Sequence, residues 1–146
     1  MQTLIRPAQP TDATALYQML CELENERMNR EAFDEVFLTN LVNRNVLYLI
    51  AESAGQPVGM ASCHVQLLLH HAAPIAEIQE MYIDPSARSQ GIGKRFIKAI
   101  LEFAFTCGAT QIEVTSNLTR HDTHRFYERE GFQKTHAKLV LKTVSR

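Results

Sequence analysis

A short loop with two glycines, between a candidate strand and an amphipathic helix, restricts what this chain can fold into. Residues 75–83 form an apolar run of strand length that stops at Asp84 and Pro85, where proline removes a backbone donor. The loop, residues 88–95 (RSQGIGKR), leads into apolar residues at helical spacing that end near Gly108. Strand, glycine loop and helix in this order predict a helix N-terminus that binds an anion.

The rest of the chain indicates one mixed α/β domain over residues 1–146, because no repeat or linker interrupts it. Apolar residues at positions i, i+3, i+4 and i+7 predict two helices, and two apolar runs around a turn predict a hairpin. In chain order, the predicted elements besides those around the loop are a strand at 3–6, helices over 16–23 and 33–41, hairpin strands at 46–51 and 58–69, a strand at 112–116, a helix at 121–130 and a last strand at 138–144.

Composition narrows the function classes. The 15 Lys and Arg against 16 Asp and Glu give a net charge of −1, which argues against general nucleic-acid binding. Residues 1–73 carry 4 basic and 8 acidic side chains, whereas residues 74–146 carry 11 and 8, so the second half suits an anionic ligand. No apolar run approaches the roughly 18 residues of a membrane span, so we expect neither a membrane anchor nor a signal peptide. We therefore expect a cytoplasmic chain whose three cysteines are reduced.

The loop does not match the two common nucleotide-binding motifs. A Walker loop needs Ser or Thr after its lysine, and here Arg95 follows Lys94. A dinucleotide fingerprint needs a third glycine where Phe96 stands. The remaining candidate is a ligand with a diphosphate, held by Arg88, by the backbone amides of 89–94, and by Lys94 and Arg95.

Three ordered motifs resemble the GNAT family of N-acetyltransferases. The loop is similar to that family's pyrophosphate loop, Q/R-x-x-G-x-G/A, through Arg88, Gly91 and Gly93. Residues 80–85 (EMYIDP) look like its central strand, and residues 125–132 (RFYEREGF) look like its F-Y-x-x-x-G-F signature. The resemblance implies a central mixed, mostly antiparallel twisted sheet flanked by about four helices, acetyl-CoA as co-substrate and a homodimer.

The resemblance also implies which residues contact coenzyme A. An Asn that the family commonly has seven residues before its tyrosine is replaced here by Arg120, and the nearest Asn is Asn117. Either residue is therefore a candidate for the pantetheine arm. The cofactor residues that the resemblance implies are Met81, Tyr82, Ile83, Arg88, Ser89, Gln90, Gly91, Ile92, Gly93, Lys94, Arg95, Asn117 and Tyr127.

Acetyl transfer to an amine needs a base, an oxyanion donor and an acid. A lysine-like amine has a pKa of about 10.4, so well under about one per cent is neutral at pH 7. The resemblance favours Glu80 as the base through a water, with Glu77 second, and Tyr127 as the acid for the thiolate. In a regular strand the two carboxylates face opposite sides, so both serve one site only if a bulge separates them. The oxyanion donor is expected to be a main-chain N–H near Met81 or Tyr82.

A narrower resemblance points to the aminoalkylphosphonate N-acetyltransferases. It rests on Cys21-Glu22-Leu23, on residues 64–66 with His70-His71, on residues 77–80 (EIQE) and on residues 121–127 (HDTHRFY). It implies a small amine that carries an acidic group, and stimulation by a divalent metal ion whose ligands stay unknown. Four side chains are candidates for binding the phosphonate: His64, His71, Arg120 and His121.

Two other functions remain open on the sequence. The acceptor can be a polyamine or a protein amine, and an acidic rather than cationic acceptor site would favour a polyamine. The chain can also be a non-catalytic regulator that binds acyl-CoA, although the presence of both Glu80 and Tyr127 counts against this.

Overall fold

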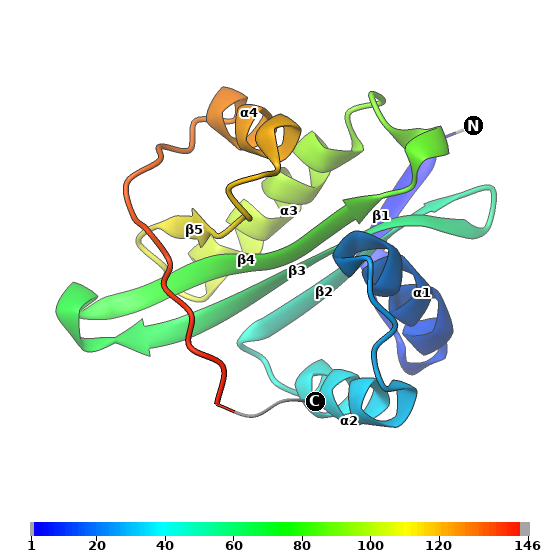
Figure 1. The fold of residues 1–146 in the computed structure, drawn as a ribbon, viewed down its shortest axis with the longest axis horizontal. Coiled ribbons are helices and arrows are strands. Elements are labelled where there is room, and N and C mark those ends of the chain that lie inside the picture. Colours follow the sequence, from blue (N-terminus) through cyan, green and yellow to red (C-terminus); the bar gives the residue numbers. More distant parts are fainter. Residues whose placement is uncertain (1, 144–146) are drawn as a thin grey trace. The chain divides into compact units, whose positions relative to one another are not determined.

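The computed structural model describes residues 2–143, which fall into two compact units that meet at Val114 and Thr115. The first unit contains the sheet and three helices, and the second contains one helix (Figure 1). In chain order the elements are β1 (Thr3–Pro7), α1 (Ala13–Glu24), α2 (Arg30–Leu41), β2 (Val46–Ser53), β3 (Gln56–Leu68), β4 (Ala73–Ile83), α3 (Ile92–Thr106), β5 (Ile112–Val114) and α4 (His121–Arg129), with 3-10 turns at 10–12, 69–71 and 85–87.

The five strands form one sheet in the order β1-β2-β3-β4-β5. All neighbouring strands are antiparallel except β4 and β5, which are parallel. The predicted hairpin is confirmed: Ser53 pairs with Gln56, and Ala54 and Gly55 between them both have positive φ, as a tight two-residue turn requires. The mixed, mostly antiparallel sheet with four helices agrees with the predicted fold class.

Helix α3 packs against one face of this sheet. Its buried residues include Ile92, Phe96, Ile100 and Ala104, each four positions from the next, so they form one stripe. The sheet residue below this stripe is Gly59. A Cβ at that position would lie 2.9 Å from a backbone oxygen of β4 and 3.5 Å from the Phe96 ring, so only glycine permits this close packing.

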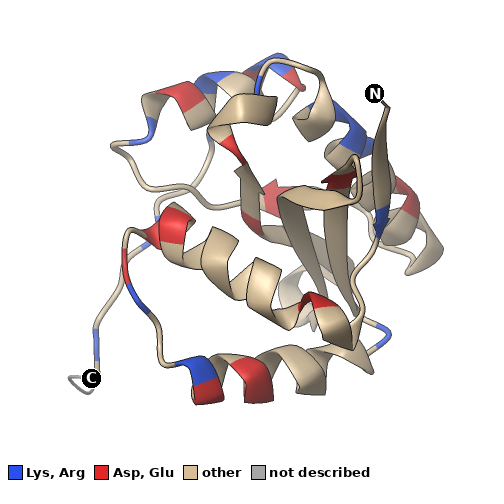
Figure 2. Ribbon diagram, turned by 90° about the vertical axis from the view of Figure 1, so that its right-hand side faces the viewer, with Lys and Arg blue, Asp and Glu red and all other residues tan. Residues whose placement is uncertain are grey.

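Helices α1 and α2 pack against the opposite face. A core cluster joins Leu16 and Met19 of α1 and Phe37 of α2 to Ile50 and Met60 of the sheet. These helix residues belong to the stripes that the apolar spacing predicted. The charged residues of the two helices are mostly acidic, because α1 has no Lys or Arg and α2 has one Arg and three acidic residues (Figure 2).

A half-buried ion pair joins β1 to the start of α1. Both Arg6 guanidinium nitrogens donate to the Asp12 carboxylate, at 2.8 and 2.9 Å, and the Gln9 N–H donates to the same carboxylate at 2.7 Å. Glu52 accepts a further bond from Arg6 at 3.2 Å. The hydrogen bond from Arg6 holds the pKa of Asp12 below its ordinary value, against the opposing effect of burial.

The predicted strand at 138–144 is wrong for the residues that the structure describes. Residues 138–143 have no secondary structure, and Val144 lies outside the described residues. Leu139, Val140 and Leu141 are 93%, 71% and 89% exposed. Three consecutive apolar residues do not define one buried face, so the pattern could not specify a partner strand. None of the helices described over residues 2–143 has the length and apolar character needed to cross a membrane.

The Arg6–Asp12 pair should make the free energy of unfolding depend on pH. Because the folded pKa of Asp12 is depressed, its contribution is present above the unfolded value of about 3.9 and is lost as pH falls through the folded pKa. Asp12→Asn should lower the free energy of unfolding by about 2 kcal/mol at pH 7 and by progressively less below about pH 4. Urea unfolding of both proteins between pH 2.5 and 7 measures this difference.

Glu52→Gln is the matched control, because Glu52 makes one longer bond to the same Arg6 and is more exposed than Asp12. We expect it to cost under about 1 kcal/mol. Equal losses in the free energy of unfolding for the two variants at pH 7 would contradict the view that Asp12 is the main partner of Arg6.

Candidate active site

The two carboxylates predicted to act in acetyl transfer face the same side of the sheet, because β4 contains a bulge. Glu80 pairs with Ser62 of β3 and Glu77 pairs with His64, while Gln79 between them has no partner on β3. Ser62 and His64 are two residues apart on β3 and therefore point to one face. Since directly opposed residues share a face, Glu77 and Glu80 also do. The bulge that the two-carboxylate hypothesis required is thus present.

This face is the one that α1 and α2 cover. Tyr48 of β2 pairs with Ser62, and its ring packs 5.6 Å from the Phe37 ring of α2. The Asn40 side chain of α2 donates a hydrogen bond of 2.8 Å to the Tyr48 hydroxyl. Tyr48, Ser62 and Glu80 therefore form one row across three strands. We call the five residues Tyr48, Ser62, His64, Glu77 and Glu80 the polar strip.

Ser62 forms hydrogen bonds with both the backbone and the side chain of Glu80. Its Oγ accepts the Glu80 backbone N–H at 3.0 Å and donates to the Glu80 carboxylate. Ser62 is fully buried, whereas Glu80 is half-buried. The carboxylate is thereby held as a hydrogen-bond acceptor at the edge of the core, which is the state that a general base needs.

Tyr48 stays a neutral phenol beside this carboxylate. Burial raises its pKa, and the negative charge of Glu80 raises it further, while the hydrogen bond from Asn40 acts in the opposite direction. The Tyr48 hydroxyl accepts from Asn40, so its own proton remains for a second partner.

Two of the predicted histidines, His64 and His71, lie on this side of the sheet. The His64 ring meets the Tyr48 ring edge-on, with centroids 6.4 Å apart. His71, in the turn before β4, has its Nε2 3.9 Å from a carboxylate oxygen of Glu113 on β5. Glu113 pairs with Glu77, so the strip continues onto β5 as a further carboxylate.

The residues present do not assemble a metal site. Among residues 2–143 no group of three or more His, Cys, Asp or Glu side chains is arranged to hold a metal ion. His124, which the sequence placed near His121, bonds through Nε2 to the Asn117 carbonyl oxygen at 2.9 Å. The divalent metal implied by the narrower resemblance therefore has no support in the described residues.

The glycine loop opens α3 as predicted. Gly91 precedes the first helical residue and has φ of 78°, a left-handed conformation that glycine adopts without strain. Ile92 and Gly93 follow in the first turn, where N–H groups lack acceptors within the helix. This geometry directs backbone donors and the positive end of the helix dipole towards the loop, as an anion site requires.

The basic side chains around the loop differ in their contacts. Arg88 donates through Nε to the Ile83 carbonyl at 2.8 Å, and its guanidinium lies 5.9 Å from the centre of the Tyr82 ring. Arg95 instead donates to the Thr3 carbonyl at 2.7 Å, which ties α3 to β1. The structure thus brings Arg88 to the end of β4 and directs Arg95 to the far edge strand. Ser89, Gln90 and Lys94 are exposed in or directly after the loop.

The predicted cofactor strand lies beyond the β4–β5 ladder. That ladder ends with Ile78 and Val114, while β4 continues to Ile83. Met81, Tyr82 and Ile83 therefore belong to the part of β4 beyond the ladder, which is where a main-chain oxyanion donor was expected.

In the second unit, Tyr127 is a buried residue of α4. Its ring meets those of Phe126 and Phe132 edge-on, with centroids 5.1 and 5.3 Å away. Burial raises the pKa of Tyr127 to about 12, and the positive charge of Arg120 lowers it slightly. The phenol is therefore protonated at neutral pH.

The other candidates of this unit cluster before and at the start of α4. The Asn117 side-chain oxygen accepts from the Thr119 backbone N–H at 2.9 Å and from its hydroxyl at 2.8 Å. Arg120 immediately precedes the helix, and His121 is its exposed first residue. Asn117 thus shapes the turn with its oxygen and leaves its amide nitrogen as the group that could meet a ligand.

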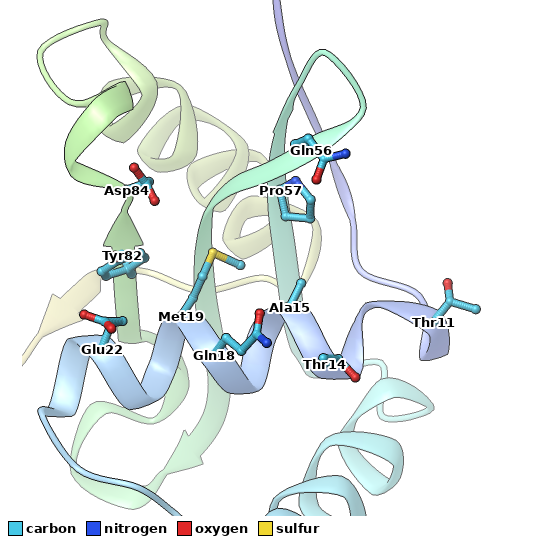
Figure 3. Close-up of a pocket in the computed structure, with 10 residues that line it drawn as sticks. All are labelled: Thr11, Thr14, Ala15, Gln18, Met19, Glu22, Gln56, Pro57, Tyr82 and Asp84. Carbon is cyan, nitrogen blue, oxygen red and sulfur yellow. The ribbon is translucent and has the colours of Figure 1, made fainter.

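A separate cavity of about 460 Å³ lies between α1, the β2–β3 turn and the end of β4 (Figure 3). Of the polar strip and the predicted site residues, only Tyr82 lines it. Its two charged groups are the carboxylates of Glu22 and Asp84, and the latter caps the turn at 85–87 through Ser86. A cavity with only acidic ionisable groups is a poor site for a dianion.

Sequence reasoning missed Ser62, Tyr48 and Asn40. Ser62 is a lone hydroxyl within an apolar run, and its alignment with Glu80 depends on the β3–β4 register. Tyr48 resembled an ordinary core aromatic residue. The only sequence signal for Ser62 would have been a polar residue paired with the bulged part of β4. The position of that bulge cannot be read from the sequence.

Comparison with known proteins identifies the class to which this chain belongs. The model of the Acetyltransferase (GNAT) family matches residues 13–132, so the chain belongs to this family. It is an N-acetyltransferase. The chain is 40% identical to the aminoalkylphosphonate N-acetyltransferase of Salmonella typhimurium over 136 residues, which cover 93% of this chain and 88% of that protein.

Two solved structures share the fold over nearly the whole chain. One, an aminoglycoside N-acetyltransferase in complex with CoA, has a TM-score of 0.88 and 16% identity, with 97% of this chain and 95% of that chain covered. The other, a transcriptional regulator from Bacillus halodurans C-125, has a TM-score of 0.87 and 26% identity, with 97% and 99% covered.

Proposed function

We propose that this protein transfers the acetyl group of acetyl-CoA to the primary amine of a small anionic acceptor, with an aminoalkylphosphonate as the specific substrate. The observation that carries the reaction class is the Glu80 carboxylate, held at the bulge of β4 beside a buried hydroxyl. The choice of acceptor is supported by the 40% identity to the Salmonella typhimurium enzyme of that name.

Acetyl-CoA would bind along the loop and the end of β4. The N–H groups at the start of α3 suit the diphosphate, because they combine unpaired helix donors with the helix dipole. Met81, Tyr82 and Ile83, beyond the β4–β5 ladder, would contact the pantetheine arm and supply the oxyanion donor. Asn117 or Arg120 is a further candidate for a contact with the arm.

In the proposed reaction the amine nitrogen attacks the thioester carbonyl directly. The new C–N bond forms and the C–S bond breaks, while one amine proton passes through a water to the Glu80 carboxylate. Glu77 faces the same side of the sheet and is the second candidate for the base. Held by Ser62, Glu80 keeps one carboxylate oxygen for this water.

Tyr127 would supply the proton for the departing thiolate. With a pKa raised to about 12, its phenol carries a proton at every physiological pH. The same shift makes it a weaker acid than free tyrosine, so it stabilises the thiolate first as a hydrogen-bond donor and then transfers the proton as charge develops on sulfur.

The phosphonate would be bound by His64, His71, Arg120 and His121. The two histidines of the first unit lie at the polar strip and beside Glu113, respectively. The acidic cavity at α1 is the less suitable place for a dianion, because its charged groups are the carboxylates of Glu22 and Asp84.

A polyamine or protein amine is the second candidate acceptor, and one observation favours it. Glu77, Glu80 and Glu113 give the strip and its extension three carboxylates, which attract a polycation more readily than a dianion.

Several properties of the whole protein belong to the same proposal. The family match spans parts of both units, which supports one catalytic domain. Because acetyl-CoA is the donor, the reaction would take place in the cytoplasm, as one step of phosphonate metabolism.

We also propose a homodimer, since Leu139, Val140 and Leu141 are exposed apolar residues. Light scattering should then give the mass of two chains, and a single-chain mass would contradict the homodimer.

Release of free thiol from acetyl-CoA tests the proposed function. With aminoalkylphosphonates, polyamines, amino acids and lysine peptides offered in parallel, kcat/KM should be highest for an aminoalkylphosphonate, at least about tenfold above its non-phosphonate analogue. Tyr127→Phe should lower kcat about 10²-fold with the best acceptor. Turnover confined to polyamines or peptides would reject the phosphonate, and acetyl-CoA binding without transfer to any amine would favour the regulator.

A further inference from the structure

We propose that Ser62 is a positioning residue, which holds the Glu80 carboxylate in its reactive orientation through a two-way hydrogen bond. The inference rests on the proposed function, in which Glu80 is the base. It goes further by assigning a role to a buried side chain of β3 that contacts Glu80 and lies in the core.

The direction of the two bonds follows from the donors present. The Glu80 N–H can only donate, so the Ser62 oxygen accepts it, at 3.0 Å. The Ser62 hydroxyl has one proton, which then points to the Glu80 carboxylate. The bonds close a ring that joins the backbone and the side chain of the same glutamate. This ring fixes the carboxylate relative to the strand that carries it.

The burial of Ser62 indicates that its hydroxyl serves to bind Glu80. Ser62 has 0% exposure and its neighbours on β3, Ala61 and Cys63, are equally buried. A hydroxyl in such a place destabilises the fold unless it is hydrogen-bonded. Its two hydrogen bonds both go to Glu80, so an alanine would suit the packing and would lack only this connection.

Holding the carboxylate matters because a glutamate side chain is flexible. Three side-chain torsions separate the Glu80 carboxylate from the backbone, and the residue is half-buried, so burial alone does not select one rotamer. The bond from Ser62 selects a rotamer whose carboxylate is directed towards β3. A base must lie within one water of the amine, so this orientation contributes to the rate.

The test is a double-mutant cycle of Ser62→Ala and Glu80→Gln, measured with the best acceptor. Ser62→Ala should lower kcat about 10- to 30-fold and change the acceptor KM less than about threefold, because the base is misplaced while the binding groups remain. Glu80→Gln should lower kcat about 10²-fold or more. The double variant should equal Glu80→Gln within about twofold, since Ser62 acts only through this carboxylate.

Rescue by a conservative variant separates positioning from a structural role. Ser62→Thr, which keeps the hydroxyl that donates to Glu80, should recover part of the lost kcat. Cys63→Ala is the matched control, because it trims the neighbouring buried residue on the opposite face of β3 and should leave kcat unchanged.

The outcomes distinguish the inference from the proposed function. If Ser62→Ala melts at the wild-type temperature and keeps wild-type kcat, or if it lowers kcat by the same factor in the Glu80→Gln background, the positioning role is wrong and the base assignment stands. If Glu80→Gln keeps wild-type turnover, the base assignment is wrong and the positioning role falls with it. Acetyl transfer to amines would remain established in either case.

Discussion

One unmatched residue in β4, Gln79, is the constraint on which the site depends. Without it, Glu77 and Glu80 would face opposite sides of the sheet, one towards α3 and one towards α1 and α2. With it, both carboxylates lie beside His64 and Ser62 on one side, and Ile78 still packs into the core. The bulge therefore allows one strand to serve the core and the site together.

The bulge and the end of the β4–β5 ladder are close in sequence. The last residue of β4 paired with β5 is Ile78, and the extra residue follows it directly. From Met81 to Ile83 the strand remains paired to β3 but not to β5. A strand with one covered edge and one edge beyond the ladder can present main-chain groups to a ligand, while Ser62 on its covered side orients the carboxylate.

The sequence predicted the elements well and their pairing poorly. Apolar spacing identified the stripes of α1, α2 and α3, because core burial on one face determines that spacing. The loop was recognisable because Gly91 needs a left-handed backbone. Ser62 and Tyr48 could not be found, since their relation to Glu80 depends on strand register, which local sequence does not encode. The last predicted strand failed for the same reason, because Leu139, Val140 and Leu141 specify no partner.

A crystal structure with CoA and an aminoalkylphosphonate would test the central claim most directly. The claim is that the acceptor amine is deprotonated on the bulge face of β4. It predicts the amine nitrogen within hydrogen-bond reach, or one water, of the Glu80 carboxylate, with Ser62 still bonded to the same side chain. An amine bound instead in the cavity of Glu22 and Asp84, with no water path to Glu80, would contradict it.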